Sequence, residues 1–207
     1  MSNEQDLSRR DLLRSVGSSI ILTTAGAGVV TPAIAQHIHS ALANEKTTAP
    51  KADYKPKYFT TREYQMVRRL SDLIIPADEH SGGALESGAA EFIDFLCGQN
   101  HDLAEIYTGG LAWIDDEMKR RYSLGFLEAK PDQQTALLDL IAYRKNDAPQ
   151  IAPGVRFFVW LRNMVVDAFY TSPVGVKDLG FMGNTAIGHF SVPQEAVDYA
   201  LKRSPFA

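Results

Sequence analysis

The sequence predicts a single, mainly α-helical domain of about five to six helices, with a long glycine-rich loop near its C-terminus. Three observations support this prediction. Apolar residues recur at helical spacing in several segments, helix-starting residues precede those segments, and no stretch shows sustained strict alternation of apolar and polar residues.

The first two predicted helices follow capping signals. Thr60 and Glu63 form a capping box, in which each side chain satisfies a backbone donor at the start of the helix. Pro76 marks the end of this helix. Ser87 is the expected cap of the second helix. The inward faces of the two helices are Met66, Val67, Leu70, Leu73 and Ile74, and then Phe92, Phe95 and Leu96.

The third helix is expected to begin at Asp102 and to contain Gly109-Gly110, where each glycine costs about 1 kcal/mol relative to alanine. Either a kink or a close helix crossing would explain the pair. Charged residues at 115–121 predict a solvated face with ion pairs four residues apart.

Prolines open the remaining helices. Pro131 begins the fourth, and Pro153 begins a fifth that runs to about Tyr170. The fifth is apolar over most of its circumference, which is typical of a central core helix. A glycine-rich loop is expected over residues 175–191, and a short terminal helix begins at 193–195.

The N-terminus predicts an export leader. Arg9 and Arg10 precede an apolar pair and a weakly apolar run, the pattern of a twin-arginine signal. Ala33 and Ala35 supply a small-x-small cleavage site, so cleavage is expected after Ala35. The alternative is a chance arginine pair before a core helix. We therefore expect a signal peptide at 1–35, an extended or disordered linker at 36–58 and the helical domain at 59–207.

Composition limits the function classes. The formal net charge is −4 and the sequence pI is about 5.7, which argues against a nucleic-acid partner. Cys97 is the only cysteine, so no internal disulfide can form, and its apolar surroundings predict a buried, inert thiol.

Two loops hold the candidate site residues. Asp78, Glu79 and His80 could bind a metal or act in acid–base chemistry, although a turn capped by Asp78 explains the same residues. In the late loop the apolar side chains either return to the core or contact another protein, and the histidine is a partner contact or a solvated residue. These loop residues are Phe181, Met182, His189 and Phe190.

Several segments in order resemble the gluconate 2-dehydrogenase subunit 3 family. Residues 70–78 read Leu-Ser-Asp-Leu-Ile-Ile-Pro-Ala-Asp and are followed by the segment at 88–94. The segments 168–173 and 175–184 come later, and the resemblance spans about 59–190. The sequence departs from the family pattern at 184–190, where the family carries more proline and glycine.

The resemblance implies a small subunit without a catalytic residue or redox centre of its own. In such complexes a large flavoprotein subunit binds FAD and oxidises a sugar, sugar acid or polyol, and a multihaem cytochrome c subunit often accepts the electrons. The small subunit stabilises the flavoprotein and escorts it through the twin-arginine translocase. The expected location is the periplasm, with membrane association through the complex.

The chain has no dinucleotide-binding glycine motif and no Cys-x-x-Cys-His haem motif, as this division of labour expects. Two other functions remain open. One is a free-standing periplasmic binding or scaffold module. The other is a small enzyme that uses Asp78, Glu79 and His80.

Overall fold

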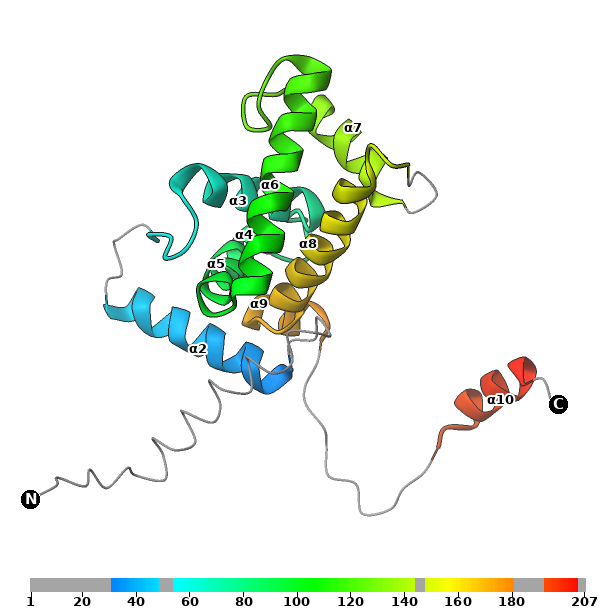
Figure 1. Ribbon diagram of the computed structural model, residues 1–207. Helices are drawn as coiled ribbons and strands as arrows, with labels where there is room; N and C mark the ends of the chain where they lie inside the picture. Colours follow the sequence, from blue (N-terminus) through cyan, green and yellow to red (C-terminus); the bar gives the residue numbers. More distant parts are fainter. Residues whose placement is uncertain (1–30, 49–53, 144–147, 181–191, 205–207) are drawn as a thin grey trace, which may run out of the picture.

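The computed structural model describes residues 31–48, 54–143, 148–180 and 192–204. All the regular structure in these ranges is helical, which confirms the predicted mainly α-helical class (Figure 1). The helices are α2 (Pro32–Thr48), α3 (Thr61–Ile74), α4 (Ala84–Ser87), α5 (Ala89–Gln99), α6 (His101–Tyr122), α7 (Pro131–Ala142), α8 (Ala152–Tyr170), α9 (Pro173–Asp178) and α10 (Gln194–Arg203).

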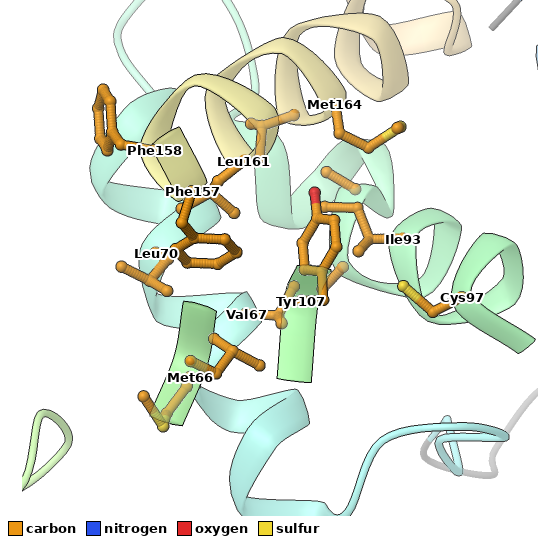
Figure 2. Close-up of a cluster of buried hydrophobic side chains, with 14 of the residues drawn as sticks. Met66, Val67, Leu70, Ile93, Cys97, Tyr107, Phe157, Phe158, Leu161 and Met164 are labelled. Carbon is orange, nitrogen blue, oxygen red and sulfur yellow. The ribbon is translucent and has the colours of Figure 1, made fainter. Parts of the chain in front are cut away.

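Helix α8 lies at the centre of the fold, as its apolar sequence predicts. It contacts α3, α4, α5, α6, α7 and α9, and it runs beside α6 in Figure 1. The helix begins with Pro153 in its first turn. Its buried side chains meet those of α3, α5 and α6 in the core that Figure 2 shows, which includes Leu70, Ile93, Tyr107, Phe157 and Leu161.

Cys97 is buried in this core, as predicted (Figure 2). Burial raises the pKa of its thiol well above the usual value, so the reactive thiolate does not form at neutral pH. The side chain acts as a small apolar residue.

The glycine pair in α6 marks a close crossing with α8, one of the two explanations open from the sequence. A Cβ atom at Gly110 would lie 2.1 Å from Cδ2 of Phe157, whereas a Cβ at Gly109 would meet nothing within 4 Å. Gly154 of α8 makes the reciprocal approach, because a Cβ there would lie 2.1 Å from Cζ3 of Trp113. Each helix therefore inserts one aromatic ring over a glycine of the other.

The start of α3 is fixed from two sides. The predicted capping box is present, with the Thr60 hydroxyl accepting from the Glu63 N–H and the Glu63 carboxylate accepting from the Thr60 N–H at 2.9 Å. The chain just before the box is held by Asp94, a fully buried residue of α5. Its carboxylate accepts hydrogen bonds from the Tyr54 hydroxyl at 2.7 Å and from the backbone N–H groups of Lys57, Tyr58 and Phe59 at 2.7, 3.1 and 2.9 Å.

The prediction of an extended linker at 36–58 is wrong for its first part, because α2 continues to Thr48. Ile34, Ala35, Ile38 and Leu42 are buried on one face of α2, which packs against α5. Apolar residues at positions i, i+4 and i+8 give the helix a stripe that the core covers.

Three smaller expectations also need correction. Ser87 does not cap the second helix; it ends α4, its hydroxyl donates to the Ala84 carbonyl, and Gly88 at φ 76° begins α5. The first part of the segment expected to be a long glycine-rich loop is helical, because residues 173–178 form α9, capped by Ser172. The acidic face of α6 is not wholly solvated, because Glu117 is buried beside Arg120.

Candidate functional site

The loop between α3 and α4 is organised around Asp78. Its Oδ1 atom accepts hydrogen bonds from the backbone N–H groups of His80 and Ser81, both at 2.8 Å, and these bonds lower the pKa of the Asp78 carboxyl. The Asp78 N–H donates to the Ser81 carbonyl at 3.0 Å. Asp78 therefore caps a tight turn, which is the structural interpretation that the sequence left open.

The two neighbours of Asp78 point into solvent. The side chains of Glu79 and His80 are 84% and 79% exposed, and His80 Nε2 lies 3.3 Å from Glu79 Oε1. Within the described ranges, no group of three or more histidine, cysteine or acidic residues is arranged to hold a metal ion. The geometry of this loop is that of an exposed turn.

The other predicted site residues fall mostly outside the described ranges. Phe181, Met182, His189 and Phe190 lie in the undescribed segment 181–191, and Arg9 and Arg10 lie before residue 31. The two alanines of the expected cleavage site are in the first turn of α2, where Ala33 is exposed and Ala35 is fully buried.

Large exposed apolar side chains gather toward the C-terminus. Val166 and Tyr170 lie one helical turn apart on α8 and are 37% and 39% exposed. Leu179, directly after α9, is 60% exposed. A contiguous exposed apolar patch can mark a protein–protein contact, and only Val166 and Tyr170 are neighbours on one helical face by their spacing. The sequence did not single these residues out, because α8 is apolar on nearly every side.

Helix α10 packs least against the other described helices. None of its residues is buried, and it stands apart from the other helices in Figure 1. Tyr199 and Leu201 are 61% and 54% exposed, and the guanidinium of Arg203 lies over the Tyr199 ring at 3.8 Å from its centroid. The helix is amphipathic, with its apolar residues uncovered.

A groove of about 510 Å³ lies between α2, the start of α5 and α9. His39 of α2 lines this groove, with Nε2 at 3.0 Å from the Thr171 hydroxyl and its ring 5.0 Å from the Phe92 ring. Burial lowers the pKa of His39 despite a hydrogen bond with the Ala168 backbone. Glu86 and Glu91 are the acidic residues that line the same groove. His39 thus links α2 to the end of α8.

An ion-pair network holds the C-terminal half of α6, and the turn after it, against α3. Arg62 of α3 donates to Glu128 at 2.6 Å and to Asp115 at 3.2 Å, and Asp115 also accepts the Phe126 N–H at 2.8 Å. The bond from Arg62 lowers the pKa of Glu128 to about 2. These contacts fix the turn after α6.

None of the helices in the described ranges combines the length and the apolar character that crossing a bilayer requires. Comparison with curated proteins and with solved structures gave no match. Residues 61–189 match the family described as gluconate 2-dehydrogenase subunit 3, and this range runs from the first residue of α3 to beyond α9. The family name denotes one subunit of a multi-subunit dehydrogenase. More than half of the chain is matched, and the protein therefore belongs to the gluconate 2-dehydrogenase subunit 3 family.

Proposed function

We propose that this protein is the non-catalytic small subunit of an FAD-dependent dehydrogenase that oxidises a sugar, sugar acid or polyol in the periplasm. The observation that carries the proposal is the family match over residues 61–189. In this proposal the flavoprotein partner holds FAD and performs the chemistry, and a multihaem cytochrome c subunit receives the electrons.

The same proposal gives the small subunit a role in export. A flavoprotein must fold to retain FAD, so it requires an exporter that accepts folded proteins. Arg9 and Arg10 supply the twin-arginine signal for both chains if the partner has none. The complex must survive translocation, and we therefore expect an obligate-type interface of more than about 2,000 Å².

The expected interface comprises the loops at 78–84 and 175–190, and the second is the stronger candidate. Leu179 lies in the second loop and is 60% exposed in the isolated subunit. Phe181 and Phe190 follow in the sequence, outside the described residues. A hot-spot side chain near the centre of an interface contributes about 2 kcal/mol or more of binding, which is about a 30-fold change in affinity.

Affinity purification of the C-terminally tagged chain from its native periplasm and membranes tests the proposal. We expect a stoichiometric flavoprotein with the absorbance spectrum of FAD. A chain that elutes alone under mild conditions and in good yield would contradict the subunit function, and would favour a free-standing binding module.

Substitutions in the loop then test the interface. Phe181→Asp, Phe190→Asp and Leu179→Asp should each greatly reduce co-purification of the flavoprotein. Leu124→Asp is the matched control, because Leu124 is 40% exposed and lies after α6, at the opposite end of this helix from α9 (Figure 1). Unchanged yield of the complex with the loop variants would refute this interface while leaving the subunit function intact.

A further inference from the structure

Helix α2 incorporates the expected cleavage site into the folded domain. Ala35, the residue before the scissile bond, is fully buried and lies on the same face as Ile34, Ile38 and Leu42. Ile38 is also fully buried, and this stripe packs against α5. Ile34 and Ala35, just before the scissile bond, are therefore part of the hydrophobic core, whereas Ala33 and Gln36 are exposed.

The first turn of α2 is also held through its backbone. The Ala35 N–H donates to the Thr31 carbonyl at 3.0 Å, and Pro32 occupies the first helical position. One turn later, His39 contacts Thr171, which lies 132 residues away in the sequence. The burial of Ile34 and Ala35 before the Ala35–Gln36 bond, and the contacts of His39 after it, thus hold the helix on both sides of the bond.

A peptidase needs an exposed and extended substrate, whereas this bond lies in a packed helix. Proteases bind the residues around the scissile bond in an extended conformation, and they cut most readily in exposed loops and termini. To enter such an enzyme, Ala35 must leave the core, and the helical hydrogen bonds of the first turn must break. Cleavage then depends on the small population of molecules in which this turn is open.

We propose that the folded subunit protects the Ala35–Gln36 bond, so that the leader is not removed there and α2 remains whole in the mature protein. The proposal rests on the proposed function, because the twin-arginine route presents a folded chain to the signal peptidase. A second small-x-small pattern, formed by Ala25 and Ala27, precedes α2 in the sequence. Removal of the leader at that pattern would leave every contact of α2 in place.

The first test uses the purified full-length chain and purified signal peptidase in detergent, with cleavage products identified by mass. A synthetic peptide of residues 20–45 shows how readily the same enzyme cuts the sequence when it is not folded. We expect cleavage after Ala35 in the folded protein to be slower than in the peptide by on the order of 10- to 100-fold, because opening must expose buried Ile34. Equal rates would overturn the proposal.

Variants of α2 separate protection by folding from poor recognition of the sequence. Ile38→Asp places a charge at a fully buried position of α2, which should detach the helix from the core and restore cleavage after Ala35. His37→Asp, at an exposed neighbouring position, should not restore it. His39→Ala, which introduces no buried charge, provides a second way to loosen the helix and should give intermediate cleavage. Resistance of both Ile38→Asp and His39→Ala to cleavage after Ala35 would overturn the proposal.

N-terminal sequencing of the exported protein shows where the leader is removed in the cell. We expect an N-terminus at or before Pro32, and an N-terminus at Gln36 in a correctly exported complex would overturn protection while leaving the proposed function intact. Failure of the chain to leave the cytoplasm would contradict the export function instead. Protection would then be decided by the experiment with purified peptidase.

Discussion

Alanine at Gly110 tests whether the α6–α8 crossing depends on the absence of a side chain. A Cβ at this position would lie 2.1 Å from Cδ2 and 2.2 Å from Cγ of Phe157. The Phe157 ring cannot move aside easily, because it is 3% exposed and packs edge-to-face on Tyr107 at 5.6 Å. Gly110→Ala must therefore separate the two helices or displace a core ring.

The magnitude follows from two opposing effects. Alanine improves the intrinsic helix propensity by about 1 kcal/mol relative to glycine. Overpacking of a closely packed core costs about 1–3 kcal/mol, and an overlap this severe belongs at the upper end. Gly110→Ala should thus lower the free energy of unfolding by about 2 kcal/mol. Gly109→Ala should raise it by up to about 1 kcal/mol, because the new Cβ meets nothing within 4 Å.

Thermal unfolding of the two variants, followed by far-UV circular dichroism, measures the difference. For a chain of this size 1 kcal/mol shifts Tm by about 2–4 °C, so Gly110→Ala should melt about 4–8 °C below the wild type. Gly109→Ala should melt up to about 4 °C above it. A Gly110→Ala protein as stable as Gly109→Ala would refute the argument that Phe157 requires this glycine.

Three further substitutions test other contacts. Asp94→Ala removes the carboxylate that accepts hydrogen bonds from the Tyr54 hydroxyl and from three backbone N–H groups, and should lower the free energy of unfolding by about 3 kcal/mol. An unchanged midpoint of urea unfolding would contradict this. Hydrogen bonding from Arg120 holds the pKa of Glu117 below 4.5, so its stabilisation is present above that pH and is lost as the pH falls. The Tm difference between wild type and Glu117→Gln should accordingly shrink from about pH 6 to about pH 3, and a constant difference would argue against it. Burial lowers the pKa of His39 below 6.5. The stabilisation from the neutral side chain is therefore complete above pH 6.5 and is lost as the pH falls through the lowered pKa. His39→Gln should flatten this part of the Tm–pH curve.

The sequence predicted the features that neighbouring residues determine. The capping box of Thr60 and Glu63 is readable because its two members lie within one turn, and the prolines at 131 and 153 mark helix starts in the same way. The turn at Asp78 is equally local, since its partners are two and three residues away. The central position of α8 followed from its apolar circumference.

Features that depend on distant partners were not readable. Asp94 gave no signal, because its partners lie 35–40 residues earlier and three of them are backbone groups. Helix α2 was missed for another reason. Ile34, Ile38 and Leu42 have helical spacing after Pro32, but the expected cleavage after Ala35 divides that pattern between a leader and a linker. The exposed residues of α8 could not be told from its core residues until its neighbours were placed.

The central position of α8 has a consequence for cooperativity. Because α8 touches six other helices, its amide hydrogens can exchange with solvent only when most of the domain opens. Helix α10 has no buried residue, so its amides should exchange at close to the rate of an open chain, and α2, which α5 covers on one face, should fall between these extremes. The protein thus combines one cooperative unit around α8 with a helix, α10, that gains no protection from the rest of the described residues.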